Sequence, residues 1–169
     1  MKKTPIYILV LLILMTACGV ATPEETSAPP ATRPPTTDSV TESSVTLTEI
    51  PLGAGYGVDG GWFELYFTNP ESLLASQETG GPDGPLAEAI DSARLSVDVA
   101  IYSLSLNSVR DALIRAHKRG VQVRMVAESD NLDRSDMQIL KETGIPILGD
   151  RREGLMHDKF VVIDNSEVW

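Results

Sequence analysis

Cysteine is almost absent from this chain, since Cys18 is the only one among 169 residues. A single thiol excludes an intrachain disulfide and any metal site built from several cysteines. A long apolar run is also missing: the stretch from Ile6 to Met15 has ten residues, whereas a helix needs roughly 20 to cross a bilayer. The sequence therefore does not predict a permanent transmembrane helix.

The sequence also lacks an excess of positive charge. The formal net charge is -10, and residues 51–169 hold 19 acidic against 11 basic side chains. Such a domain repels a nucleic-acid backbone at long range unless a local basic patch overcomes the field. One cluster could form such a patch: Arg110, Arg115, Lys118, Arg119 and Arg124. The same residues also fit the solvated face of a helix and its following strand, and we favour that interpretation.

The first 18 residues have the layout of an export signal. Lys2 and Lys3 precede the apolar stretch, and Thr16-Ala17-Cys18 follows it. Met15 to Cys18 is similar to a bacterial lipobox, whose cysteine becomes lipid-modified, although Met15 stands where leucine is usual. We expect an exported, extracytoplasmic protein of the cell envelope that is lipid-anchored to the membrane through Cys18. The alternative is a plain secretory signal in which Cys18 is incidental.

Residues 19–50 are dominated by Thr, Pro and Ser, with almost nothing large and apolar to bury. This composition predicts a disordered tether. The remaining residues, 51–169, are expected to form a folded domain. Within that domain Gly55 to Gly60 has the letters of a dinucleotide-binding glycine motif. We reject the match, because a tether precedes it and a strand-like segment follows it, and we expect a flexible glycine loop.

The rest of the domain alternates between strand and helix patterns. Residues 95–101 alternate apolar and polar side chains, residues 109–116 repeat apolar ones at helical spacing, and residues 121–127 return to strand character. Helices are also predicted at 85–93 and 134–143, and strands at 145–148 and 156–163. Strand, helix, strand is a βαβ unit, so the pattern predicts an α/β domain with parallel pairing.

Three polar residues near the end of the sequence carry the chemistry. His157 and Lys159 are two apart in the last predicted strand, so both should project from one face, and Asp164 lies just past it. This His-x-Lys-x4-Asp arrangement, together with Tyr102-Ser103 and the helix that ends at Gly120, resembles the phospholipase D superfamily. The resemblance covers roughly residues 62–169.

The resemblance implies a fold and a mechanism. The expected fold is an αβα sandwich around a mixed, largely parallel sheet, incomplete at its C-terminal end. His157 would attack phosphorus and form a phosphohistidine, Lys159 would bind the non-bridging oxygens, and Asp164 would hydrogen-bond to and orient a catalytic histidine. No cofactor or metal is implied. His117, the only other histidine, lacks a lysine two residues later, and we expect it at the surface of a helix C-terminus.

The family builds a complete active site from two such motifs, and this sequence contains one. Members usually also carry a Gly-Ser-x-Asn run on the strand after the motif, which is absent here. We therefore expect an N-terminal fragment of a longer protein, inactive by itself, whose second motif comes from a missing half or a homodimer partner. The favoured function is hydrolysis of phospholipid diesters. A superfamily nuclease and a non-catalytic phosphate-binding lipoprotein are the alternatives.

Overall fold

A computed structural model of the chain describes residues 45–169. The predicted export signal, the lipobox-like Cys18 and the tether as far as residue 44 lie outside the described residues. Strand β1 (Thr48–Leu52) begins inside the range expected to be tether, and residues 45–169 all belong to one compact unit. No helix in residues 45–169 is both long and apolar enough to cross a membrane.

The unit begins with a three-stranded antiparallel sheet, in which β1, β2 (Gly55–Asp59) and β3 (Glu64–Thr68) pair in that order. The prediction of a flexible loop at residues 55–60 is wrong, because residues 55–59 form the central strand β2. Glycine is needed there for close approach: a Cβ on Gly55 would lie 1.9 Å from the Phe67 carbonyl oxygen, and one on Gly57 would lie 2.7 Å from the Tyr66 ring. The glycines therefore serve strand pairing.

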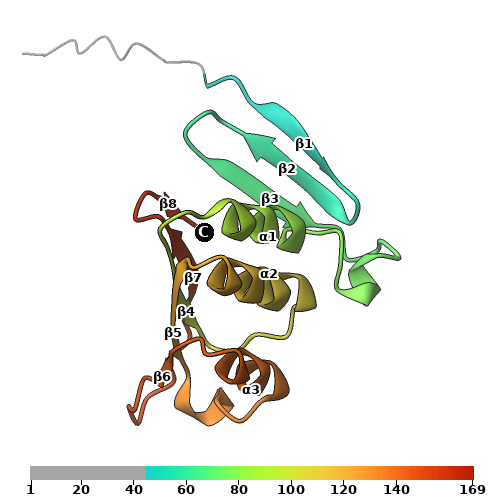
Figure 1. Ribbon diagram of the computed structural model, residues 1–169. Coiled ribbons are helices and arrows are strands. Elements are labelled where there is room, and N and C mark those ends of the chain that lie inside the picture. The colour runs from blue at the N-terminus through green and yellow to red at the C-terminus, as the bar shows by residue number, and fades with distance from the viewer. Residues whose placement is uncertain (1–44) are drawn as a thin grey trace, which may run out of the picture. The chain divides into compact units, whose positions relative to one another are not determined.

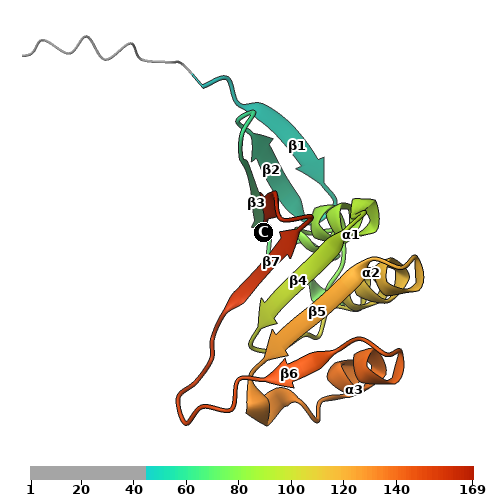
Figure 2. The same ribbon diagram turned by 60° about the vertical axis from the view of Figure 1, so that its left-hand side comes forward.

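The second sheet has five strands in the order β6-β5-β4-β7-β8, and Figure 2 shows β6, β5, β4 and β7 side by side. Strands β4 (Ser96–Ile101), β5 (Gln122–Ala127) and β6 (Ile147–Gly149) run parallel, whereas β7 (Lys159–Ile163) pairs antiparallel with both β4 and β8 (Glu167–Val168). The predicted βαβ unit and the mixed α/β sheet are confirmed. Only two of the four strand pairings are parallel, so "largely parallel" overstates the pattern.

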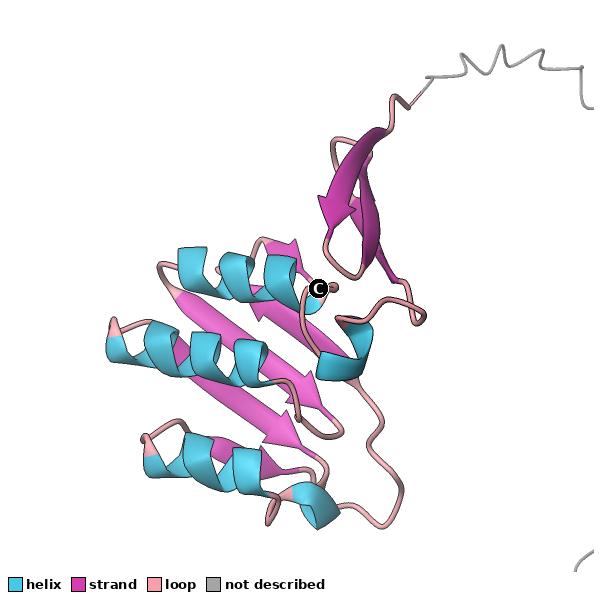
Figure 3. Cartoon of the chain, turned by 90° about the vertical axis from the view of Figure 1, so that its right-hand side faces the viewer, coloured by secondary structure: helices cyan, strands magenta, loops and turns pink. Residues whose placement is uncertain are grey.

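Three helices, α1 (Asp83–Ser92), α2 (Asn107–Lys118) and α3 (Ser135–Glu142), lie side by side on one face of this sheet (Figure 1 and Figure 3). The three-layer sandwich that the sequence predicted is therefore present only as two layers in residues 45–169. The opposite face leaves apolar side chains exposed, among them Val126, Leu148 and Phe160.

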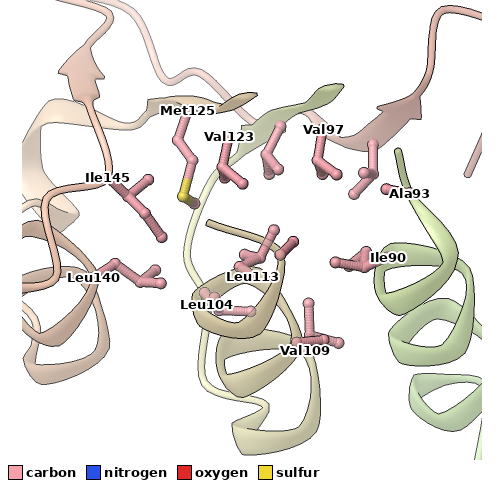
Figure 4. Close-up of a cluster of buried hydrophobic side chains, with 14 of the residues drawn as sticks. Ile90, Ala93, Val97, Leu104, Val109, Leu113, Val123, Met125, Leu140 and Ile145 are labelled. Atoms are coloured by element: carbon pink, nitrogen blue, oxygen red, sulfur yellow. The ribbon is translucent and has the colours of Figure 1, made fainter. Parts of the chain in front are cut away.

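The hydrophobic core fills the space between the sheet and these helices (Figure 4). Ile90 of α1 and Leu113 of α2 are 0% and 1% exposed and face Val97 and Val123 of the strands. Full burial of an aliphatic side chain of this size contributes about 1.5 to 3 kcal/mol. This packing fixes where the strand ends lie, and with them the polar residues that follow the strands.

Glycines end α2 and α3 where the sequence predicted a stop. Gly120 and Gly144 have φ values of 91° and 92°, a left-handed conformation that glycine adopts without a Cβ clash. Each glycine N–H donates to a carbonyl of the last helical turn, His117 O at 2.9 Å and Lys141 O at 2.9 Å. The predicted helices and strands are present, with ends displaced by a few residues.

Candidate functional site

The candidate site lies at the carboxyl ends of β4, β5 and β6. Because β7 runs in the opposite direction, its first residue lies at the same edge of the sheet. Tyr102 follows β4, Glu128 follows β5, Asp150 follows β6, and His157 precedes β7. Ligands of open α/β sheets bind outside the carboxyl ends of the strands, so the predicted catalytic residues occupy the edge where a substrate is expected.

His157 lies in an exposed segment without regular secondary structure, two residues before β7. The prediction that His157 belongs to the strand is therefore wrong. Its imidazole lies against the ring of Tyr102, with centroids 5.1 Å apart and planes tilted by 56°. The nucleophile predicted from the sequence is thus open to solvent on one side and supported by an aromatic ring on the other.

Lys159 is the first residue of β7 and is paired in register with Ile101. Its Nζ lies 5.3 Å from the centre of the Tyr102 ring, within reach of a cation–π interaction. The same Nζ donates a 3.1 Å hydrogen bond to the carbonyl oxygen of His157. Tyr102 therefore contacts both predicted catalytic side chains.

Asp164 is not part of this cluster. It follows β7 at the far end, and five steps of about 3.3 Å each place it about 16 Å along the strand from Lys159. Its carboxylate accepts hydrogen bonds from the backbone N–H groups of Arg94, Leu95 and Ser96 at 3.0, 2.7 and 3.0 Å. The N–H of Ser96, then those of Leu95 and Arg94, lower the pKa of this carboxyl.

The expected role of Asp164, hydrogen bonding to a catalytic histidine, is thus corrected. Its backbone φ is 52°, a left-handed conformation that Asp tolerates better than most residues. The turn aims the carboxylate at the chain entering β4, where it holds the start of one strand against the end of its neighbour. Asp164 is a structural residue of the sheet in this arrangement.

Sequence reasoning missed Glu128, whose side chain is 4% exposed. Its Oε2 accepts a 2.6 Å hydrogen bond from the N–H of Met156, the residue before His157. On the other side of His157, the carbonyl oxygen of Asp158 accepts a 2.8 Å hydrogen bond from the N–H of Tyr102. An acidic residue directly after a buried strand was the available signal, since carboxyl ends of strands carry functional groups.

Asp150 was missed as well. Its carboxylate accepts hydrogen bonds from the hydroxyl and the N–H of Ser129 at 2.9 and 3.2 Å, and the bond from the hydroxyl is the main cause of a lowered pKa of Asp150. The Ser129 hydroxyl in turn accepts from the N–H of Arg151 at 3.0 Å. The segment before His157 is therefore tied to the end of β5 at both of its ends.

The five basic residues considered as a patch are mostly paired with carboxylates. Arg110 contacts Asp111 and Asp136, and Arg115 and Arg119 share Asp91. Arg124 pairs with Asp98. The hydrogen bond from Arg115 lowers the pKa of Asp91. Local carboxylates thus offset this charge, which agrees with the solvated-face interpretation.

The remaining candidates play no part in the cluster. His117 lies half-buried in the last turn of α2, on the helix rather than at the edge of the sheet that carries His157. Across residues 45–169 no group of three or more His, Cys, Asp or Glu side chains could hold a metal ion.

Comparison with known proteins finds a matching family model and several similar proteins. A family model described as "Cardiolipin synthase, PLD-like domain" matches residues 86–169. Human mitochondrial cardiolipin hydrolase is 35% identical over 112 residues, which cover 60% of this chain and 44% of that protein. A protein of Rickettsia bellii named phospholipase D is 34% identical over 85 residues, covering 49% of this chain and 42% of the relative. The chain thus spans less than half the length of these two relatives.

Among solved structures, Nuc from Salmonella typhimurium, described as a phospholipase D family member, has 32% identity and a TM-score of 0.46. That match covers 52% of this chain and 62% of Nuc. NucT from Helicobacter pylori has 25% identity and a TM-score of 0.40, with 50% of this chain and 60% of NucT covered.

Proposed function

Residues 86–169 of this chain belong to the phospholipase D superfamily, and on that premise we propose that the protein hydrolyses phosphodiester bonds, with His157 as nucleophile. The observation that supports this most is the shared contact of His157 and Lys159 with the Tyr102 ring at the edge of the sheet. An exposed imidazole beside a lysine ammonium suits attack on an anionic phosphorus centre. The same two side chains buried in a hydrophobic core would be out of reach of such a substrate.

The two side chains supply different parts of the reaction. A neutral imidazole nitrogen of His157 forms a bond to phosphorus as the bond to the leaving alcohol breaks, and the alcohol oxygen takes a proton. Lys159 holds the non-bridging oxygens and offsets the negative charge that develops on them. Water then attacks the phosphohistidine, which restores the imidazole and releases the phosphomonoester. Neither step requires a metal ion.

The proton for the leaving alcohol comes from a second histidine. Residues 45–169 contain one His-x-Lys pair, so we propose that a second motif completes the site. It is supplied by a further part of the protein or by a second copy of this chain. The exposure of His157 and Lys159 leaves both accessible to such a partner.

The proposed substrate is a phospholipid. Two relatives carry the names cardiolipin hydrolase and phospholipase D. The net charge of -10 opposes the approach of a nucleic acid from solution, and the arginines that could offset it are paired with Asp91, Asp98 and Asp136. The same charge opposes an anionic lipid surface, but the anchor proposed below at Cys18 would hold the domain beside such a surface. No observation on the described residues favours a nuclease.

A direct test uses the full natural protein with cardiolipin vesicles and phosphatidate release as the readout. We expect turnover by the wild type, loss of at least about a hundredfold in His157→Ala, and no change in the matched control His117→Ala. Mass spectrometry should find a phosphatidyl adduct on His157 in the quenched wild type. Binding of vesicles without turnover would instead support a non-catalytic lipoprotein, and cleavage of single-stranded DNA but not lipid would support a nuclease.

The anchor is a separate proposal. We propose export to the cell envelope and lipid modification of Cys18, supported by the apolar stretch that ends at Thr16-Ala17-Cys18. The mature protein should begin at Cys18 and partition into detergent after Triton X-114 phase separation. Cys18→Ser should move it to the aqueous phase. Partitioning that is unchanged in Cys18→Ser would contradict the proposal.

A further inference from the structure

A buried carboxylate lies beside the proposed nucleophile without a cation to balance it. Glu128 is 4% exposed, and across residues 45–169 no lysine, arginine or histidine forms an ion pair with it. Burial of a polar side chain is costly unless hydrogen bonds satisfy it. An apolar residue would fill the end of β5 without that cost.

The hydrogen bonds of Glu128 show where the carboxylate acts. Oε1 accepts a long hydrogen bond from the N–H of Asp130 at 3.4 Å, and Oε2 accepts a short one from the N–H of Met156 at 2.6 Å. The short bond joins the end of β5 to a residue 28 positions later in the chain. A hydrogen bond this short and this well buried ties the two parts of the chain firmly together, so Glu128 is suited to holding that segment.

The segment it holds has few other attachments. Residues 151–155 are all exposed and have no regular secondary structure. His157 lies between two fixed points, the Met156 N–H bound by Glu128 and the Asp158 carbonyl bound by the Tyr102 N–H. Lys159, in contrast, is already placed by its register with Ile101 in the sheet. Glu128 therefore supplies one of the two backbone attachments that flank the histidine, whereas the position of the lysine does not involve Glu128.

We infer that Glu128 is a positioning residue, which sets the location of the His157 imidazole by binding the backbone of Met156. This inference rests on the proposed function for its kinetic consequence. A nucleophile displaced by about 1 Å loses on the order of a hundredfold in rate. Loss of Glu128 should therefore lower kcat and leave KM nearly unchanged, because Lys159 keeps its place for binding the phosphate.

Three variants of the full protein test this. In Glu128→Gln an amide oxygen still accepts from the Met156 N–H, whereas Glu128→Ala removes the acceptor. Glu142→Ala, an exposed glutamate at the end of α3, is the matched control. With cardiolipin vesicles, kcat should fall about tenfold to a hundredfold in Glu128→Ala, return to within about threefold of wild type in Glu128→Gln, and stay unchanged in the control. Wild-type kcat in Glu128→Ala, or equal loss in the Ala and Gln variants, would overturn the inference.

A second measurement tests the positioning role of Glu128 without using lipid turnover. An absence of turnover would count against the proposed function and not against this role. Hydrogen exchange of the Met156 amide should be slow in the wild type and Glu128→Gln, and at least tenfold faster in Glu128→Ala. The amide of Leu113, in the core of α2, should keep its protection in all three. Unchanged protection of Met156 in Glu128→Ala would refute the positioning role.

Discussion

The carboxylate of Asp164 accepts a 2.7 Å hydrogen bond from the N–H of Leu95, 69 residues earlier in the chain. The aspartate of the catalytic motif therefore joins the end of β7 to the start of β4. His157 and Lys159 lie at the opposite end of β7. The three residues of one sequence motif thus divide into the proposed reactive pair and a residue that holds the sheet.

A prediction for Asp164 follows from its lowered pKa. The backbone N–H groups favour the ionised carboxyl in the folded state, so its stabilising effect is present above the ordinary pKa, near 3.8, and is lost as the pH falls through the lower folded-state pKa. Asp164→Asn, which tolerates the same left-handed φ, should lower the unfolding midpoint in urea at pH 7. The difference from wild type should shrink near pH 3.

The control for this measurement is Asp133→Asn, an exposed aspartate before α3, which should unfold like the wild type at both pH values. A stable Asp164→Asn protein that has lost only activity would contradict the structural role and restore a catalytic one.

Tyr102 provides the second prediction. Its ring contacts His157 and lies under the ammonium of Lys159, so the ring rather than the hydroxyl should matter. Tyr102→Phe should keep kcat within about twofold of wild type, and Tyr102→Ala should lose about tenfold, as expected for loss of about 1.4 kcal/mol of aromatic support. Steady-state turnover of cardiolipin vesicles measures both. Equal losses in the two variants would assign the role to the hydroxyl.

The sequence predicted the order of elements because local signals determine them. Alternating apolar residues identified β4 and β5, and glycines at 120 and 144 identified the ends of α2 and α3. The same reasoning failed at residues 55–60, because the need for glycine in β2 comes from the neighbouring Phe67 and Tyr66, which only pairing brings close. Contacts across strands are not visible in local composition.

The proposed reactive pair could be named from the sequence, but its supports could not. His157 and Lys159 were singled out by the resemblance of their motif to the phospholipase D superfamily, whereas Glu128 acts on Met156 through a backbone hydrogen bond 28 residues away. The role of Asp164 was misjudged for a similar reason, since its partners are three backbone N–H groups that any residue supplies. Side-chain identity in a sequence says little about interactions that involve backbone atoms of distant segments.

The core gives a prediction about stability. Leu113 is 1% exposed and lies between α2 and the strands, so Leu113→Ala should lower the free energy of unfolding by about 2 to 5 kcal/mol. Leu95→Ala is a matched control, since Leu95 is 66% exposed, and it should change stability by less than about 0.5 kcal/mol. Urea denaturation followed by circular dichroism measures both. A small effect of Leu113→Ala would mean that α2 is not packed on the sheet as described.

The paired arginines give the last prediction, which concerns nucleic acid. A protein that binds DNA through several free cations loses about 10³-fold or more in affinity between 50 and 200 mM salt, because it releases counterions from the phosphates. Arg115 and Arg119 share Asp91, and Arg124 pairs with Asp98, so little of their charge is available for phosphates.

Fluorescence anisotropy with a labelled single-stranded oligonucleotide should show weak binding at 50 mM salt and a slope of log affinity against log salt shallower than about -2. Asp91→Asn frees both arginines and should strengthen that binding and steepen the slope, whereas Asp133→Asn should not. Tight, steeply salt-dependent binding by the wild type would show that these ion pairs open on contact with DNA, and would make the nuclease the better proposal.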